Sequence, residues 1–418
     1  MVPSNTPARR GTSRRQLLVG GGAAGLGAVA ALGIHQLVSP AEAVTTQPEL
    51  NGAGTVPFYG EHQAGITTAA PAHAMFIGLN LLPDADKDSV RRMFKVLSSD
   101  AATLTQGRSA LADTEPELAA TPANLTVTFG VSPKAVKLAG RQVPTWLKPL
   151  PKFSIDKLDE DLSGGDVFIQ ICSDDPVTLS HAARMLLKDA RSFATIKWSH
   201  RGFRQAYGSH AAGTTMRNLF GQVDGTSNPQ PSDPNFDSLT WEPQGWLRGG
   251  TSVVVRKIQM NLDTWDELDR HGREQSVGRY LSNGAPLTSS PEAPEAEFDA
   301  PDFDATTAGG LKIIPEFSHV ARSRSTDPGE RILRRGYNYD DAATGSQISD
   351  AGLIFVSFQA DVDRQYVPIQ RRLDELDLLN QWTTPIGSAV FAILPGCQEG
   401  GFVGETLFAE DGKSGATP

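Results

Sequence analysis

Residues 165–205 read "GDVFIQICSDDPVTLSHAARMLLKDARSFATIKWSHRGFRQ" and contain a strand, a helix and a strand in that order. Residues 165–173 form an apolar run of strand length bounded by polar and glycine residues. Residues 175–193 carry a proline at their start, where a helix tolerates it, and are predicted to be helical. Residues 195–205 are predicted to form the second strand. The segment therefore predicts the second half of a unit that packs helices on a sheet.

The residues before this segment supply the first half of the same unit. A predicted strand at 72–82 is followed by a predicted helix at 84–106, whose first turn is acidic, and by a strand at 124–130. Together with residues 165–205, this gives the order β-α-β-β-α-β.

The second half of the chain repeats that order. The predicted strands are 251–262, 331–339, 352–360 and 387–395, and the predicted helices are 264–272 and 362–379. Two β-α-β-β-α-β units predict an α+β protein made of tandem ferredoxin-like units with antiparallel sheets. This prediction depends on element order alone, because residue identity between the halves is weak.

A chain of 418 residues is long enough for two domains with separate cores. The predicted boundaries are a signal segment at 1–43, an N-terminal arm at 44–71, an N-terminal ferredoxin-like domain at 72–215, a C-terminal ferredoxin-like domain at 216–410 and a tail at 411–418. The connection from 273 to 330 is much longer than an ordinary loop, and its acidic, proline-rich middle is expected to be flexible.

The N-terminus has the features of an export signal. Arg14 and Arg15 precede an apolar run rich in glycine and alanine, which ends in the small-residue site Ala41-Glu42-Ala43. A twin-arginine signal carries folded proteins, so it suits a chain that takes up a cofactor before export, and predicts a periplasmic or secreted protein. A membrane anchor and the general secretory route are the alternatives.

Charge and cysteine content exclude several classes of protein. The chain has a net charge of −10, and removal of the signal, which carries a net +3, changes this to −13. An acidic protein does not favour nucleic acid as a partner. Cys172 and Cys397 are the only cysteines, which excludes a disulfide framework and a thioether-linked haem. Both are predicted to be buried apolar residues.

Seven histidines follow the signal, and none belongs to a zinc or non-haem iron motif. A metal site in this chain would depend on one histidine, as haem iron does on its proximal side. In "RILRRGYNY" (331–339), side chains alternate between two faces, so only one of Arg334 and Arg335 can enter a given pocket. Two solvated edge-strand arginines are the alternative.

The stretch "GQVDGTSNP" (221–229) places Asp224 between two glycines. Asp-Gly is common in hairpin turns, so an ordinary turn is one interpretation. A calcium loop is excluded by the spacing, because Gly225 and Thr226 stand where further ligands would be needed.

Three motifs taken together resemble the dye-decolorizing peroxidases. They are G-x-x-D-G at 221–225, "SHVAR" at 318–322 and "ILRRGYNYD" at 332–340, in the order of that family. The likeness extends over residues 55 to 410 and is closest to the exported, twin-arginine branch, which includes deferrochelatase-type proteins. The family fold is a tandem ferredoxin-like pair, in agreement with the predicted element order.

The resemblance implies one non-covalent haem b per chain, bound in the C-terminal half. It implies that His319 ligates the iron, that Asp224 moves a proton between the two oxygens of hydrogen peroxide, and that Arg334 stabilises developing charge. Gly221 and Gly225 would let the backbone approach the haem. Asp361 or Asp363 is expected to accept a hydrogen bond from His319. Because carboxylic acids ionise at lower pH than imidazole, activity is expected to favour acidic pH.

The implied function is reduction of hydrogen peroxide with electrons from phenol- or dye-type donors. A deferrochelatase-like protein that removes or delivers haem iron is the alternative, and both would use the same pocket; a role as cargo of an encapsulating shell is a third. The aromatic residues Tyr337, Tyr366, Trp382, Trp241 and Trp246 are either radical stations or ordinary packing. The sequence leaves open whether the protein forms a homo-oligomer.

Overall fold

The computed structural model describes residues 51–345 and 348–409. The predicted signal segment, the first residues of the arm (44–50) and the predicted tail (411–418) lie outside the described residues. The prediction of export therefore stays a prediction.

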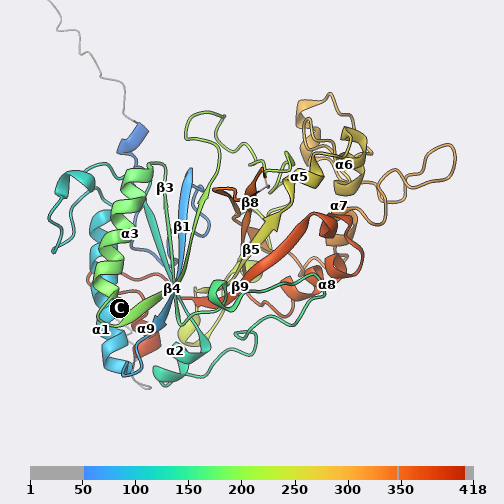
Figure 1. Ribbon diagram of the computed structural model, residues 1–418. Coiled ribbons are helices and arrows are strands. Elements are labelled where there is room, and N and C mark those ends of the chain that lie inside the picture. The colour runs from blue at the N-terminus through green and yellow to red at the C-terminus, as the bar shows by residue number, and fades with distance from the viewer. Residues whose placement is uncertain (1–50, 346–347, 410–418) are drawn as a thin grey trace, which may run out of the picture. The chain divides into compact units, whose positions relative to one another are not determined.

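The N-terminal half of the fold is a four-stranded antiparallel sheet covered by two helices. Its strands β1 (His73–Leu81), β2 (Thr126–Val131), β3 (Val167–Ser173) and β4 (Ala194–Phe203) pair in the order β2-β3-β1-β4. Helices α1 (Lys87–Leu104) and α3 (Pro176–Ala190) lie side by side on one face of this sheet (Figure 1). This strand order is that of a ferredoxin-like unit.

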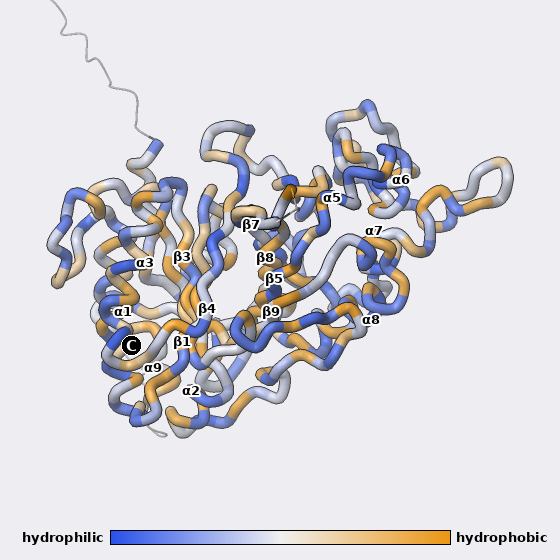
Figure 2. Tube along the Cα trace, viewed as in Figure 1, coloured by the Kyte–Doolittle hydropathy of each residue, from blue (hydrophilic) through white to orange (hydrophobic). Residues whose placement is uncertain are grey.

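Both helices begin where the sequence has an acidic N-cap. Asp86 Oδ1 accepts a hydrogen bond from the Ser89 N–H at 2.7 Å, and Ser89 Oγ accepts one from the Asp86 N–H at 2.9 Å, which completes a capping box. Asp175 caps α3 in the same position by accepting from the Thr178 N–H at 2.8 Å. In Figure 2, both helices mix polar and apolar colour along their length, as helices with one buried face do.

The C-terminal half has the same sheet order. Its strands β5 (Thr251–Met260), β7 (Tyr337–Asp341), β8 (Asp350–Gln359) and β9 (Thr383–Ile393) pair in the order β7-β8-β5-β9. The connections carry α5 (Leu262–Trp265), α6 (Arg270–Val277) and α8 (Tyr366–Leu376). The first, second, third and fourth strands of each half thus occupy equivalent places. The prediction of tandem ferredoxin-like units is confirmed.

The two sheets are joined at both edges. β4 meets β7 through the pair Phe203 and Asn338, and β2 meets β9 through Gly130 with Ile393 and Val131 with Ala392. Eight strands therefore follow one another in a closed series. The two-residue strand β6 (Leu333–Arg334) pairs with the outer edge of β8.

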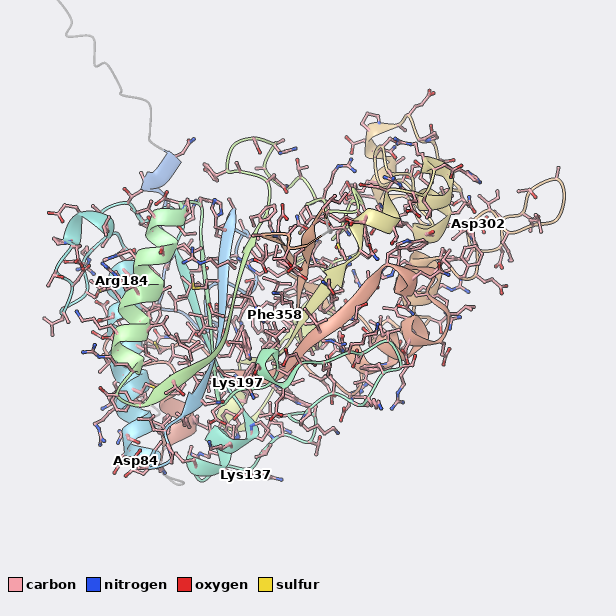
Figure 3. The ribbon with its side chains drawn as sticks, viewed as in Figure 1. Asp84, Lys137, Arg184, Lys197, Asp302 and Phe358 are labelled. Atoms are coloured by element: carbon pink, nitrogen blue, oxygen red, sulfur yellow. The ribbon has the colours of Figure 1, made fainter. Side chains whose placement is uncertain are left out.

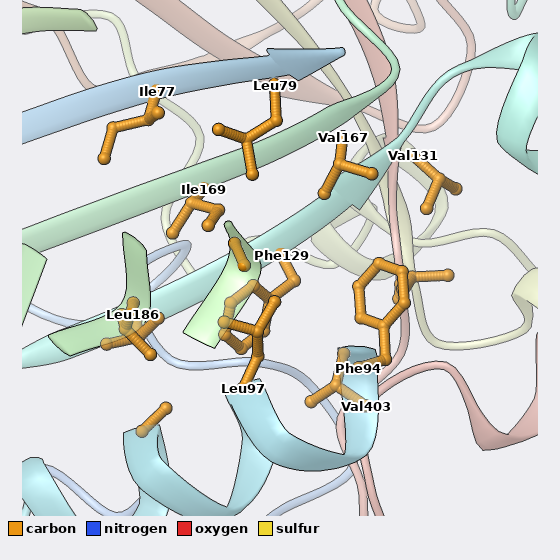
Figure 4. Close-up of a cluster of buried hydrophobic side chains, with 14 of the residues drawn as sticks. Ile77, Leu79, Phe94, Leu97, Phe129, Val131, Val167, Ile169, Leu186 and Val403 are labelled. Atoms are coloured by element: carbon orange, nitrogen blue, oxygen red, sulfur yellow. The ribbon is translucent and has the colours of Figure 1, made fainter. Parts of the chain in front are cut away.

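Two apolar cores separate these layers. One lies between α1, α3 and the first sheet and contains Phe94, Leu97, Phe129, Ile169 and Leu186 (Figure 4). The other lies between the two sheets and contains residues from both halves, including Phe76, Phe168, Tyr337, Phe358 and Phe391. Figure 3 shows Phe358 among the central strands, whereas Arg184 on α3 and Asp302 on the acidic connection lie at the periphery. Cys172 and Cys397 are buried, as predicted.

Several predicted elements differ from the structure. The remaining short helices were not predicted: α2 (Pro133–Leu138), α4 (Phe236–Thr240) and α7 (His319–Ser323) lie in connections, and α9 (Glu405–Phe408) follows the last strand. The predicted helix 264–272 is split into α5 and α6. The predicted strand 331–339 is interrupted at Arg335 and Gly336, between β6 and β7. The arm is also more than an exposed segment, because the Gln63 amide donates to the carbonyls of Phe129 and Leu394.

Among the helices of the described residues, none is long and apolar enough to cross a membrane.

A buried histidine in β4 predicts loss of stability in mild acid. His200 is 5% exposed and its ring stacks on Trp198 with 4.9 Å between centroids. Burial, together with the charge of Lys257, lowers the pKa of His200 to about 4. Between this value and the ordinary value near 6.5, the unfolded state binds more protons, so stability rises with pH across that window.

We therefore expect the contribution of neutral His200 to the free energy of unfolding to be complete above pH 6.5 and to be lost as the pH falls toward 4. Between pH 7 and pH 5, the free energy of unfolding measured in urea should fall by about 2 kcal/mol more for wild type than for His200→Phe. Phenylalanine keeps a flat ring against Trp198, and His210→Phe at an exposed site is the control. Equal losses in wild type and His200→Phe would contradict this assignment.

Candidate functional site

A cavity of about 470 Å³ with mainly apolar walls lies in the C-terminal half. Its walls include Phe220, Ile258, Val277, Phe355, Leu373 and Leu379. Pockets of this size and polarity are typical of binding sites for small molecules and cofactors. Asp224, Gly225, His319 and Arg334 also line it. The structure therefore brings together the site residues that the sequence predicted, except Gly221, which does not line the cavity.

The turn that carries Asp224 is a short hairpin closed by a bridge between Arg217 and Val223. The Asp224 N–H donates to the Met216 carbonyl at 2.8 Å. Gly221 has φ of +81° and Gly225 has φ of +138°, both values that favour glycine. Gly221 does not line the cavity, so its backbone conformation accounts for the glycine.

Asp224 and Arg334 form an ion pair at the wall of the cavity. Arg334 Nη1 donates to Asp224 Oδ1 at 2.7 Å, and the side chains are 27% and 19% exposed, respectively. Asn218 Nδ2 lies 3.4 Å from the other carboxylate oxygen, Asp224 Oδ2. The carboxylate thus has one strong, charged partner and one long contact, and it remains accessible from the cavity.

The two adjacent arginines point in different directions, as strand alternation predicted. Arg334 reaches the cavity, whereas Arg335 is 4% exposed and donates to the carbonyls of Thr68 and Ala69 in the arm. Arg335 therefore connects the arm to the C-terminal sheet. Neither arginine is a solvated edge residue.

His319 is the first residue of α7 and its imidazole lies against the cavity. Its Nδ1 donates to Asp377 Oδ2 at 2.6 Å, and the His319 side chain is 34% exposed. Nε2 has no hydrogen-bond partner among the described residues. Burial alone would lower the pKa of His319, but the charge and hydrogen bond of Asp377 outweigh it and hold the pKa above the ordinary value. Arg334 and Asp224 line the same cavity as His319, and their charges act on the pKa of His319 in opposite directions.

The prediction of Asp361 or Asp363 as the partner of His319 is wrong. Asp361 accepts from the Arg364 N–H, and Asp363 pairs with Lys148. Asp377 lies instead at the start of the 3₁₀ helix η6 (Leu378–Gln381), where its Oδ1 also accepts from the Leu379 N–H at 3.0 Å. This second bond fixes the carboxylate that orients the imidazole.

Comparison with known proteins places this site in a family. The N-terminal model of the Dyp-type peroxidases matches residues 63–204, and the C-terminal model matches residues 215–398. The chain belongs to the Dyp-type peroxidase family. It is therefore a peroxidase, an oxidoreductase that acts on hydrogen peroxide.

Known relatives match most of the chain. A dye-decolorizing peroxidase from Thermobifida fusca is 35% identical in sequence, over an alignment that covers 96% of this chain and 98% of the relative. A deferrochelatase from Escherichia coli K12 is 32% identical, covering 82% of this chain and 84% of its own. A DyP-type peroxidase from Cellulomonas bogoriensis, known from a crystal structure, is 49% identical in sequence. Its superposition has a TM-score of 0.83 and covers 87% of this chain and 100% of the other.

In this Dyp-type peroxidase, the acidic connection is attached to the site rather than free, contrary to the expected flexibility. Glu297, in the 3₁₀ helix η5 (Pro294–Phe298), accepts from the hydroxyls of Thr215 at 2.6 Å and Thr226 at 2.8 Å. Arg279, which lines the cavity, donates to the Glu297 carbonyl at 2.8 Å. These bonds connect the segment to the turn that carries Asp224.

Sequence reasoning did not find Asp377, Arg279 or Ile155. Asp377 lies in "ELDLLNQW", which matches no motif, although its position before a short helix indicates an N-cap. Ile155 comes from the N-terminal half and still lines the cavity. Of the five aromatic residues considered as radical stations, Trp246 is half-buried and the other four are buried, and Tyr366 lines the cavity.

Proposed function

We propose that the cavity holds one haem b, with His319 Nε2 as the ligand to iron, and that the protein uses it to reduce hydrogen peroxide with electrons from small aromatic donors. The observation that supports this most is the arrangement of His319, Asp224 and Arg334, which come from three separate elements and line one apolar cavity.

The residues present fit this cofactor. A porphyrin needs apolar walls, and Phe355, Leu373 and Leu379 are among those that the cavity offers. The iron needs one imidazole nitrogen, and Nε2 of His319 is free because Nδ1 is committed to Asp377. No three histidine, cysteine, aspartate or glutamate side chains converge on a metal site elsewhere in residues 51–345 and 348–409.

Haem, when bound, supplies the iron at which the peroxide oxygens are separated and holds the oxidising equivalents that the donors later remove. The chain provides the proton movements: the Asp224 carboxylate accepts a proton from one oxygen of hydrogen peroxide and returns it to the other, which leaves as water. Arg334 stabilises negative charge on the departing oxygen. Overall, one hydrogen peroxide, two protons and two donor electrons give two waters.

Asp377 acts through His319. By accepting a hydrogen bond from Nδ1–H, it favours the tautomer in which Nε2 carries the lone pair and raises the electron-donating strength of the ring. The carboxylate and the guanidinium are mostly buried beside apolar walls, so their charges are screened less than they would be in water.

The experiment that tests the proposal is purification of the protein after expression with haem supplied. We expect one haem per chain and hydrogen peroxide consumption that depends on a phenolic donor. The deferrochelatase named among the relatives gives the alternative function. Release of iron with appearance of free protoporphyrin in the absence of peroxide, without donor-dependent turnover, would favour that alternative.

We also propose that the protein is exported by the twin-arginine machinery. Support comes from Arg14 and Arg15 before the apolar run and from the Ala-x-Ala site that ends at Ala43. Exchange of both arginines for lysine is expected to retain the protein in the cytoplasm when cells are fractionated. Unchanged export of this variant would show that another route is used.

A further inference from the structure

The side chain of Asn228 binds the backbone of Arg334. Asn228 Nδ2 donates to the Arg334 carbonyl at 2.7 Å, and Asn228 Oδ1 accepts from the Arg334 N–H at 3.1 Å. A side-chain amide that engages both backbone groups of one residue does what a neighbouring strand would otherwise do. On the other side of β6, the Arg335 N–H donates to the Val356 carbonyl of β8 at 2.8 Å. The backbone at Arg334 and Arg335 is therefore held from both sides.

Asn228 belongs to the same turn as Asp224. The Asn228 N–H donates to the Gly225 carbonyl at 3.0 Å, which closes the turn that begins directly after Asp224. Residues 224–228 thus carry the carboxylate at one end and the amide that holds Arg334 at the other. This short segment links the backbone positions of Asp224 and Arg334, although the two residues lie 110 positions apart in the chain.

We propose that Asn228 is a positioning residue that sets the contact between Arg334 and Asp224. Asn228 does not line the cavity, and it acts by holding Arg334 so that Nη1 meets Asp224 Oδ1 at 2.7 Å. This inference rests on the proposed roles of Asp224 and Arg334. It also explains why the turn continues into "TSNP" after its glycine, a feature that the proton transfer itself does not use.

Substitution Asn228→Ala tests the role. We expect kcat/KM for hydrogen peroxide to fall about 10- to 100-fold, because misplacement of a catalytic group by about 1 Å has effects of that order. Haem content should be unchanged. A crystal structure of the variant should show a longer distance between Arg334 Nη1 and Asp224 Oδ1. An unchanged distance, or an unchanged kcat/KM, would overturn the proposal.

Asn283→Ala is the matched control. The side-chain amide of Asn283 also bonds to backbone groups. Its Nδ2 donates to the carbonyls of Ser290 at 3.2 Å and Ala293 at 2.9 Å, and it makes no bond to Arg334. It should lose a similar amount of thermal stability and keep its kcat/KM. An equal loss of kcat/KM in both variants would mean that general loosening of the loops is responsible.

Substitution Asn228→Asp gives a readout that a purely structural role would not move. The ionised carboxylate keeps an acceptor for the Arg334 N–H but has no donor for the Arg334 carbonyl, whereas the protonated carboxyl has both. The ratio of kcat/KM between this variant and wild type should therefore rise as the pH falls. A ratio that is constant with pH contradicts the proposed pair of bonds.

A double-mutant cycle with Arg334→Leu separates this inference from the function on which it rests. If Asn228 acts through Arg334, Asn228→Ala should have little further effect once the guanidinium is gone. If Asn228→Ala lowers kcat/KM by the same factor in wild type and in Arg334→Leu, the positioning role would be overturned. If Arg334→Leu alone leaves kcat/KM unchanged, the proposed function of Arg334 fails instead.

Discussion

Substitution of His319 by alanine is expected to yield a protein purified with little or no haem. Nε2 of the imidazole has no hydrogen-bond partner among the described residues, and the buried carboxylate of Asp377 orients the ring. Loss of a group that merely orients a metal ligand costs about 10- to 100-fold in metal affinity, so loss of the ligand itself should cost at least about 100-fold. The fold should persist, because α7 packs on α8 at one side of the cavity and contributes no residue to either apolar core of the fold.

The measurement is haem per chain, from the absorbance spectrum and iron content, with circular dichroism to check the fold. His271→Ala, at an exposed position on α6, is the control and should keep a full complement of haem. His319→Gly supplied with imidazole should regain haem, because the small molecule can occupy the vacated volume. Full haem content and an unchanged spectrum in His319→Ala would show that another residue ligates the iron.

Asp377→Asn should fall between wild type and His319→Ala. The amide can still contact Nδ1, but it cannot provide the negative charge that favours the tautomer with the proton on Nδ1, so haem affinity or turnover should fall about 10- to 100-fold. An effect of this size would show that the histidine and the carboxylate act as a unit.

The fold could be predicted because the pattern of each half is local. Segments such as 165–205 contain their own strand and helix signals, and repetition of the order in the second half identified the tandem arrangement. The closure of two sheets into one series could not be predicted, since it depends on single pairs such as Phe203 with Asn338. The break between β6 and β7 was also missed, because "RILRRGYNY" has uninterrupted strand character.

The site was predictable only in part, for a related reason. His319, Asp224 and Arg334 belong to motifs with a family resemblance, so their types and order indicated their roles. Asp377 lies 58 positions after His319 and has no motif of its own; its role arises only when α7 packs on α8. Ile155 reaches the cavity from the other half because Asp374 binds the backbone N–H groups of Ser154 and Ile155. Contacts of this kind depend on tertiary packing rather than on local pattern.

Asp224→Asn is expected to lower kcat/KM for hydrogen peroxide about 10²- to 10⁴-fold while haem content stays the same. The amide keeps the shape of the side chain and can still accept a hydrogen bond from Arg334 Nη1, so the packing of the turn should be preserved. It cannot accept a proton, and loss of a general acid–base group typically costs this much. Peroxide concentration should be varied at saturating donor, across acidic and neutral pH.

The control is Asp327→Asn, which removes a negative charge from the same cavity at a residue whose carboxylate accepts a bond only from the Gly329 backbone. If Asp224 acts by its charge alone, the two variants should show comparable losses. If it acts as a proton carrier, only Asp224→Asn should show the large loss. A variant that turns over peroxide at the wild-type rate would remove Asp224 from the mechanism and leave the charge of Arg334 as the main contribution of this wall of the cavity.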